Sequence, residues 1–424
     1  MLRKKSLFLV ILVSLLLMIT SLYAAVKIQF WHMYDSGPAK ELMDSLIAEF
    51  NEMHKGEIEV EDLGISFWDY WDKLGVAIAA GQEPDVFQND LGNVGGRADS
   101  GLLENLLPYL KEKGVNPDEV FFEEPLKMCK LGEGLYALPF ETDVRLLFYN
   151  KKLFKEAGLD PNTPPKTWDE LWEFADKITK VNEDGSYDVL GFNPIYGQSY
   201  FWMYVWGNGK SFIDGNGNIV VNSPEIVELL EEWQEMIDKL GVEKLDEFNA
   251  TYGWGPSDAF LNNKLGMVIQ VGNFISQIKT FAPDLEYGVA YIPYPKTYAS
   301  WSNGFSLELS SRSKHKKEAI EFMLFLTSKE PQFKLAKTLS SLVCNVKAAY
   351  DPELMSNPEW RIQVNTLNFT KFRPFVLEAP KWYEELQKAV DEVKYGKKTP
   401  QKALDDAQKR ILSEIEKYRL THKK

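Results

Sequence analysis

The sequence contains few residues that could hold a metal or act as a thiol nucleophile. Its 424 residues include only two cysteines and four histidines, and none falls at the spacing of a zinc site. Cys129 and Cys344 lie far apart in the sequence, so we expect two buried free thiols rather than a disulfide. The chain also lacks a nucleophile elbow, an HExxH helix, a P-loop and a GxGxxG after its first predicted strand. We therefore expect no metal, no cofactor and no catalytic centre.

Positive charge is also scarce. Lys and Arg total 48 against 62 Asp and Glu, which gives a formal net charge of −14. This balance argues against nucleic acid or an anionic membrane surface as the partner. The hydrophobic content of 45% and aromatic content of 13% are typical of a packed globular protein. A chain of this length exceeds one ordinary core, so we expect two lobes.

Long apolar runs are absent except at the N-terminus. Arg3, Lys4 and Lys5 precede a mainly apolar run from Leu7 to Ile19, which is short for a bilayer span. Residues 20–25 then offer a cut after Ala24 or Ala25, and no cysteine follows for a lipid anchor. We predict a signal peptide over residues 1–25, with an uncleaved anchor as the alternative. The mature protein is then periplasmic or otherwise extracytoplasmic.

Strands and helices alternate after this leader. The pattern predicts strands at residues 27–31, 58–63 and 84–87, separated by helices at 39–53 and 66–81. Such alternation builds a parallel sheet. Ligands of open α/β sheets bind at the carboxyl ends of the strands. The loops at residues 32–38 and 88–94 occupy such positions, so we expect them to line a binding site.

The stretch from Tyr136 to Phe174 is the most informative one. A strand at 146–149 leads to a short helix at 151–157, and Thr167 with Glu170 forms the capping box of a second helix. Its sequence pattern, LPF…LFYNKKLF…AGL…PPKTWDEL, closely resembles that of the extracellular solute-binding proteins of ABC importers, in the branch with maltose- and maltodextrin-binding proteins. Further blocks resemble the family in the same order: AAGQEPDVF…GGRADSGLLENL, AFLNNKLGMVIQVGNF, SKHKKEAIEFMLFLTSKEPQ and KKTPQKALDDAQKRI.

This resemblance implies an α/β fold of two lobes joined by a hinge, similar to type II periplasmic binding proteins, with a mostly parallel sheet in each lobe. It implies that the N-terminal lobe comprises residues 26–142 and 270–328, and that the C-terminal lobe comprises 143–269 and 329–424. The chain would then cross the hinge near residues 141–145, 269–272 and 327–330.

Aromatic side chains are the expected sugar contacts, because flat rings stack on the C–H faces of pyranoses. Residues 192–212 contain eight aromatics interrupted by glycines, although half or more of these rings are expected to be core. The resemblance assigns sugar stacking to Tyr200 and Trp382. It also places Phe274 where related proteins carry a stacking tryptophan.

Polar contacts complete the predicted site. Asn89 and Asp90 depart from the maltodextrin pattern, which favours a smaller or differently shaped ligand than maltose. Asp143 keeps an acidic position at the first hinge, where a carboxylate can accept hydrogen bonds from vicinal hydroxyls. The complete set of predicted ligand contacts is Tyr200, Trp382, Asp143, Asn89, Asp90, Asp35, His32, Trp202, Trp206, Gln198, Phe274, Trp254, Trp301, Asn303 and Arg373.

Three functions remain open from the sequence. The first is an ABC importer component that captures a mono- or oligosaccharide by lobe closure and delivers it to membrane permease subunits, as a monomer. The second is the same scaffold with a polyol, a glycerol phosphate-like solute or an amino sugar. The third is a secreted glycoside hydrolase, which needs two carboxylates at a set separation.

One spacing is also found in calcium loops. Asp214, Asn216, Asn218, Asn222 and Glu225 fall at ligand positions of an EF-hand-like loop, but Ile219 stands where that loop requires glycine. A hairpin followed by a helix start at Pro224 is the simpler interpretation.

Overall fold

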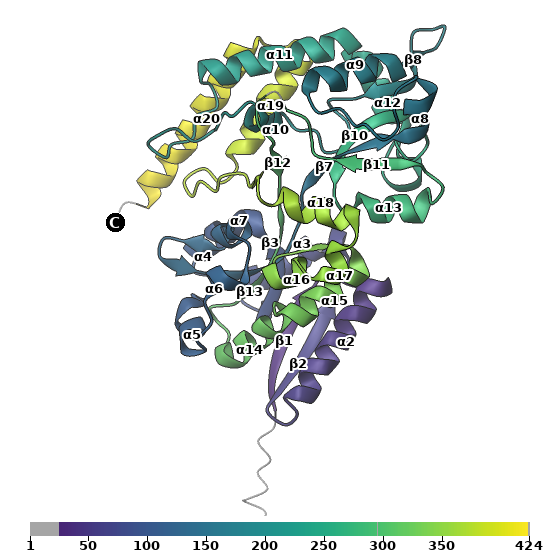
Figure 1. Ribbon diagram of the computed structural model, residues 1–424. Helices are drawn as coiled ribbons and strands as arrows, with labels where there is room; N and C mark the ends of the chain where they lie inside the picture. The colour runs from purple at the N-terminus through teal and green to yellow at the C-terminus, as the bar shows by residue number, and fades with distance from the viewer. Residues whose placement is uncertain (1–24, 295, 423–424) are drawn as a thin grey trace, which may run out of the picture.

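The computed structural model describes residues 25–294 and 296–422 (Figure 1). Two α/β lobes lie one above the other, and helices cover the sheet of each. The two-lobe α/β fold predicted from the sequence is confirmed. The predicted signal peptide falls almost entirely outside the described residues. Within the described part of the chain, none of the helices combines the length and apolar character that a bilayer span requires.

The first lobe contains a six-stranded sheet. Its strand order is β14 (Leu342–Val343), β6 (Ala137–Thr142), β13 (Gly304–Leu309), β3 (Val86–Asp90), β1 (Val26–His32) and β2 (Ile58–Gly64). The helices of this part of the chain are α2 (Gly37–Met53), α3 (Phe67–Ala80), α4 (Val94–Asp99), α5 (Leu107–Glu112), α6 (Pro117–Val120), α7 (Glu123–Met128), α14 (Lys316–Leu326), α15 (Lys329–Leu339) and α16 (Val346–Ala349).

The second lobe contains a five-stranded sheet. Its order is β11 (Tyr287–Ala290), β7 (Arg145–Asn150), β10 (Leu265–Val271), β9 (Tyr187–Phe192) and β8 (Lys180–Val181). Its helices are α8 (Lys151–Glu156), α9 (Trp168–Ile178), α10 (Phe201–Gly207), α11 (Pro224–Leu240), α12 (Val242–Thr251), α13 (Phe274–Phe281), α19 (Trp382–Lys394) and α20 (Pro400–Thr421). Helices α17 (Pro352–Met355) and α18 (Pro358–Thr366) follow α16, and α18 packs against β11.

The prediction of mostly parallel sheets is wrong in detail, because both sheets are mixed. Strands β2, β1 and β3 are parallel, but β13 runs antiparallel to β3 and to β6. In the second lobe β7 is antiparallel to both β10 and β11. Both reversed strands, β7 and β13, are the first strands formed after the chain enters a lobe from the other lobe.

The lobes also divide the chain differently from the predicted boundaries. Strand β11 belongs to the second sheet, whereas β14 pairs with β6 in the first sheet and α15 packs on α2. No strand changes sheet near residues 269–272 or 327–330. The links between the lobes are instead residues 143–144, 291–303 and the segment that leads from β14 to α19. We infer a first lobe of residues 26–142 and 304–357, with the second lobe in 145–290 and 358–422.

Two local predictions hold. The Thr167 hydroxyl accepts a hydrogen bond from the backbone N–H of Glu170 at 3.1 Å, which begins α9 as the capping pattern predicted. In the loop with calcium-like spacing, the Asp214 carboxylate accepts the backbone N–H groups of Asn216 and Asn218, each at 2.8 Å. This carboxylate therefore forms hydrogen bonds within a hairpin turn, as the simpler interpretation predicts.

Both thiols are buried and unpaired in the described structure, as predicted. Cys129 lies behind α7, where its thiol donates to the Pro125 carbonyl at 3.5 Å, and Cys344 follows β14. Burial raises the pKa of each thiol well above its ordinary value. Neither group can therefore ionise readily in the folded state.

Thiol labelling tests this arrangement. We expect Ellman's reagent to react with neither cysteine in the native protein and with both after unfolding in guanidinium chloride, without reductant. Rapid labelling of the native protein would contradict the burial. Loss of both thiols in the unfolded protein would indicate a disulfide.

Candidate functional site

The lobes meet at a hinge that is built from three chain segments. Strand β12 (Ser300–Trp301) pairs in parallel with β15 (Thr370–Lys371). The Ser300 hydroxyl accepts the backbone N–H of Arg145 at 2.8 Å and donates to the carbonyl of the same residue at 2.9 Å. The Asp143 carboxylate accepts the backbone N–H of Asn303 at 2.8 Å. Side-chain hydrogen bonds thus hold all three segments together where the chain changes lobe.

Aromatic rings and arginine guanidinium groups stack on one another beside this hinge. The Arg145 guanidinium carbon lies 3.8 Å from the centroid of the Trp301 ring, and that of Arg373 lies 5.0 Å from the same centroid. Arg373 also lies 3.7 Å from the Tyr383 ring centroid. Burial lowers the pKa of both guanidinium groups from their ordinary value. An arginine stays charged at neutral pH even so, and the ring faces stabilise that charge.

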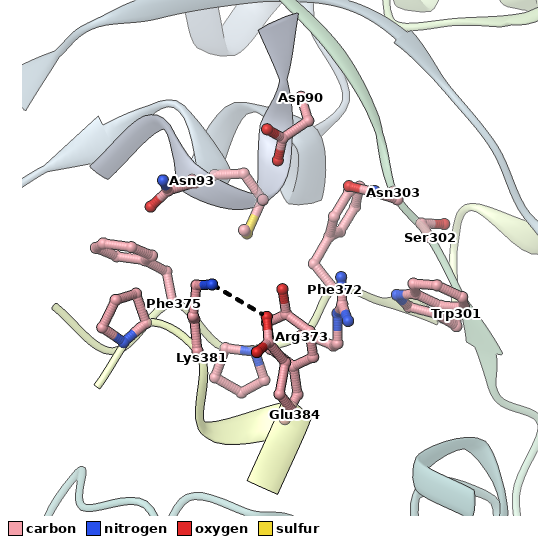
Figure 2. A pocket seen from close by; sticks show the side chains of 15 residues that line it. Asp90, Asn93, Trp301, Ser302, Asn303, Phe372, Arg373, Phe375, Lys381 and Glu384 are labelled. Carbon is pink, nitrogen blue, oxygen red and sulfur yellow. Dashed lines mark ion pairs between the residues drawn. The ribbon is translucent and has the colours of Figure 1, made fainter. Parts of the chain in front are cut away.

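Two adjoining cavities lie along this stack. The first, which we call the inner cavity, has a volume of about 300 Å³ and lies between the lobes (Figure 2). The second, the outer cavity, has about 710 Å³ and opens along α19. Both are lined by Trp301, Arg373, Tyr383 and Glu384, so they adjoin along these four side chains, and we call the two cavities together the cleft.

Each lobe contributes to the inner cavity. Asp90 and Asn93 come from the end of β3 and the short turn after it, and Figure 2 shows them opposite Arg373 and Glu384. Trp301 and Asn303 come from the hinge. Since β3 ends at this point, the site lies at the carboxyl edge of the first sheet, as the strand and helix alternation predicted.

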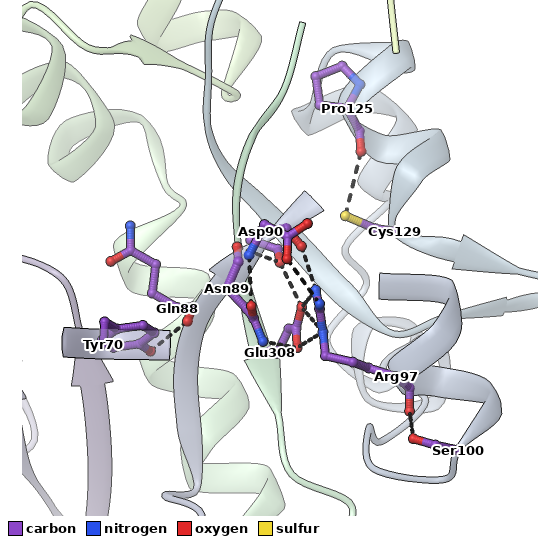
Figure 3. Close-up of polar contacts among 10 residues, drawn as sticks. Tyr70, Gln88, Asn89, Asp90, Arg97, Ser100, Pro125, Cys129 and Glu308 are labelled. Atoms are coloured by element: carbon purple, nitrogen blue, oxygen red, sulfur yellow. Dashed lines mark hydrogen bonds and ion pairs between the residues drawn. The ribbon is translucent and has the colours of Figure 1, made fainter. Parts of the chain in front are cut away.

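A buried ion cluster holds Asp90 in place (Figure 3). Arg97 donates from Nε and Nη2 to the fully buried Glu308 carboxylate, at 2.9 and 2.6 Å, and its Nη1 lies 3.2 Å from Asp90 Oδ2. Burial raises the pKa of Glu308, and the adjacent Arg97 charge opposes that rise. The fork geometry of arginine fixes both carboxylates at once, so Asp90 presents its remaining lone pairs to the cavity.

Six of the predicted contacts line the cleft. They are Tyr200, Trp202, Trp301, Arg373, Asp90 and Asn303. Tyr200 and Trp202 stack with ring centroids 4.3 Å apart and an interplanar angle of 8°. Two other predicted contacts, Gln198 and Asp143, line neither cavity but bind the Arg145 side chain. Gln198 accepts a hydrogen bond from Arg145 Nη2 at 3.2 Å, and Asp143 forms an ion pair with the same guanidinium.

Three predicted stacking residues are core residues instead. Trp382 is fully buried against Phe212, and its Nε1 donates to the Pro374 carbonyl at 2.9 Å. Trp206 also packs on Phe212. Phe274 is fully buried beside Phe148 in the second lobe. None of the three rings lines either cavity, because each lies on the side of its helix that packs into the core of the second lobe.

The polar predictions at the strand ends were partly wrong. His32 is fully buried, with Nε2 3.1 Å from Asp62 and Nδ1 accepting the Tyr34 backbone N–H at 3.2 Å. Asn89 is buried and accepts the backbone N–H of Asp90 at 2.9 Å. Asn89 therefore shapes the strand end, while its neighbour reaches the cavity.

Two further candidates are solvent-exposed and line neither cavity. Asp35 lies in the exposed loop before α2, where its carboxylate accepts the Ser36 hydroxyl at 3.1 Å. Trp254 is 62% exposed in the loop after α12. A loop position beside glycines was therefore insufficient to place a ring in the cleft.

The residues of α19 that line the cleft are not among the predicted contacts. Trp382, Leu386 and Val390 repeat at the spacing of one buried helix face. The residue after Trp382 must then project elsewhere, and Tyr383 with Glu384 lines both cavities. That helical period was the signal that could have identified Tyr383. Other missed lining residues are Asn93, Phe372, Phe375 and Lys381.

The sequence and the fold both match known proteins. Residues 35–333 match the family model described as bacterial extracellular solute-binding protein. The chain belongs to this family. Its members are binding proteins, which favours solute capture over the glycoside hydrolase hypothesis.

Solved structures and a curated relative agree with this assignment. The structure titled CpMnBP1 with mannotriose bound superposes with a TM-score of 0.78 at 29% identity, covering 91% of this chain and 100% of that one. An ABC transporter solute-binding protein from Thermotoga lettingae TMO with α-D-tagatose gives 0.76 at 26% identity, covering 92% and 100%. The sn-glycerol-3-phosphate-binding periplasmic protein UgpB of Pectobacterium atrosepticum is 26% identical, over 94% of this chain and 93% of its own.

The buried cluster gives a stability prediction. Replacing Arg97 with Met leaves the buried Glu308 carboxylate without its partner, so we expect a loss of about 3–5 kcal/mol in the free energy of unfolding. The double variant Arg97→Met/Glu308→Leu removes the stranded charge and should lose less. Urea unfolding followed by tryptophan fluorescence measures both.

A matched exposed pair serves as the control for this experiment. Lys239 and Asp176 lie 3.0 Å apart with side chains about 60% exposed, so Lys239→Met should cost at most about 1 kcal/mol. Equal losses for Arg97→Met and Lys239→Met would contradict the assigned role of the cluster.

Proposed function

We propose that this protein is the solute-binding component of an ABC importer and captures a carbohydrate in the cleft between its lobes. The observation that supports this most is the composition of the cleft. The aromatic rings of Tyr200, Trp301 and Tyr383 line the cleft together with the carboxylates of Asp90 and Glu384. A sugar offers C–H faces for the rings and hydroxyl donors for the carboxylates, so this mixture suits it chemically.

Charge within the inner cavity supports an uncharged ligand. Asp90 and Glu384 carry negative charge there, and Arg373 and Lys381 carry positive charge. Lys381 Nζ lies 3.6 Å from Glu384 Oε1 (Figure 2). Arg97 forms an ion pair with Asp90. Fixed donors and acceptors of both signs can form hydrogen bonds with many hydroxyls without a net attraction for ions.

Lobe closure is the proposed capture step. The hinge links let the second lobe rotate against the first, and closing removes water from the bound solute. Two contacts away from the hinge already join the lobes. The Tyr418 hydroxyl donates a hydrogen bond to the Asp99 carboxylate at 2.9 Å. Gly95 lies against the Phe375 ring, so closely that a Cβ at this position would be 2.3 Å from a ring carbon. Gly95 therefore allows the second lobe to approach α4 closely.

The cellular setting follows from the same proposal. The leader at residues 1–25 is a signal peptide, and the mature protein acts outside the cytoplasm as a monomer. The closed form then docks on the permease subunits of the importer and releases the solute unchanged. The extracellular character of the family supports this location.

A ligand screen with two variants tests the carbohydrate proposal. We expect thermal shifts with some mono- or oligosaccharides, and titration calorimetry should then show one site per chain. Tyr383→Ala removes a ring face from both cavities, so affinity should fall at least about tenfold, or about 1.4 kcal/mol.

Trp254→Ala is the matched control, because this exposed ring lies away from the cleft. Its affinity should equal that of the wild type. Unchanged affinity in Tyr383→Ala would refute the site, and conversion of a bound sugar into products would refute the binding function.

An anionic solute is the second candidate. Arg373 supports it, because no carboxylate of the described residues lies within ion-pair distance of this guanidinium, which faces the cleft. The name of the UgpB relative states a phosphate-bearing ligand for that protein. An unpaired guanidinium can bind a phosphate or carboxylate in a bidentate manner.

Glycerol 3-phosphate is the probe for this candidate. If the solute is anionic, the wild type should bind glycerol 3-phosphate more tightly than glycerol, and Arg373→Gln should abolish that preference. Binding of neutral sugars with no response to glycerol 3-phosphate would exclude this candidate and leave the first.

A further inference from the structure

The outer cavity extends well beyond the stack at the hinge. It follows one face of α19 toward the C-terminal end of that helix. Tyr383, Gln387, Asp391 and Tyr395 line it at intervals of four residues, which places them in a row on one side of the helix. Trp382, Leu386 and Val390, each one position earlier, are buried in the lobe. Tyr383 packs partly on the core and on Arg373, whereas Gln387 and Asp391 are only partly buried and Tyr395 is exposed.

The row has alternating chemistry. Gln387 donates to Asp391 at 3.3 Å, so an amide and a carboxylate lie side by side at its centre. Tyr395 is 44% exposed at its far end, with the ammonium groups of Lys394 and Lys397 at 4.3 and 5.4 Å from the ring centroid. Planar polar groups between two rings are the combination that recognises hydroxyl-rich ligands.

The length of the row sets the size of the ligand. From Tyr383 to Tyr395 the helix rises by roughly 18 Å, which is longer than one sugar ring. The inner cavity, at about 300 Å³, is at the small end of ligand sites. A monosaccharide in the inner cavity would leave Gln387, Asp391 and Tyr395 unused, because these three residues line only the outer cavity.

We propose that the ligand is an oligosaccharide of at least three rings, and that Gln387, Asp391 and Tyr395 form an outer subsite for its distal rings. This inference rests on the proposed carbohydrate function. The inner rings contact Asp90, Trp301 and Arg373 between the lobes. The distal rings lie on α19, where they contact only the second lobe.

Chain length is the variable that tests this subsite. Calorimetric titrations use two series of probes, mannobiose to mannohexaose and maltose to maltohexaose, against the wild type and the triple variant Gln387→Ala/Asp391→Ala/Tyr395→Ala. In the series that binds, we expect wild-type affinity to rise at least tenfold from two rings to four or more. The triple variant should lose that gain and bind the disaccharide as the wild type does.

Two further variants serve as a control and as a replacement for the triple variant. Lys409→Ala, an exposed position on α20, is the surface control and should behave as the wild type. If the triple variant does not fold, Tyr395→Ala alone should lose part of the same gain. Affinity that is independent of ring number, or equal losses for short and long ligands, would overturn the subsite while the carbohydrate function stands. Absence of binding by every probe would overturn both.

Discussion

The cleft depends on the position of the Trp301 ring. This residue lies in β12, where the chain passes from one lobe to the other, and its ring contacts guanidinium groups from two different segments. Arg145 joins the stack to the hinge hydrogen bonds, and Arg373 joins it to the cavities. The same ring therefore lies against both the hinge and the cavities. Loss of the ring would leave the buried Arg145 cation without the π face that stabilises it, whereas Arg373 would keep the Tyr383 ring.

The fold was largely predictable because local signals and the fold agree. The caps at Ser66, Asn150 and Thr167 begin their helices as side chains of these types do. Strand direction was harder to predict. Whether β7 or β13 runs parallel to its neighbours depends on where the chain crosses between lobes, and no local pattern in the sequence encodes that crossing. The same reason explains why the predicted lobe boundaries separate the segments of β11 and β14 from the sheets to which these strands belong.

The site was predictable in part, and the errors have a common cause. Aromatic residues were correctly expected in the cleft, but the choice among neighbours depends on which face of an element is buried. Trp382 and Tyr383 are adjacent, and only the helical phase of α19 separates the core ring from the cleft ring. Asn89 and Asp90 differ in the same way at the end of β3. The Arg97 and Glu308 pair joins residues 211 positions apart, which no local spacing could reveal.

We propose that both lobes contact one uncharged, hydroxyl-rich solute, which binds between Asp90 and Tyr383. A crystal structure of the protein with the tightest-binding saccharide tests it most directly. We expect a sugar ring in contact with Trp301 and Tyr383, with its hydroxyls hydrogen-bonded to Asp90. A ligand bound elsewhere, or bound in this cleft without contact to the first lobe, would contradict it.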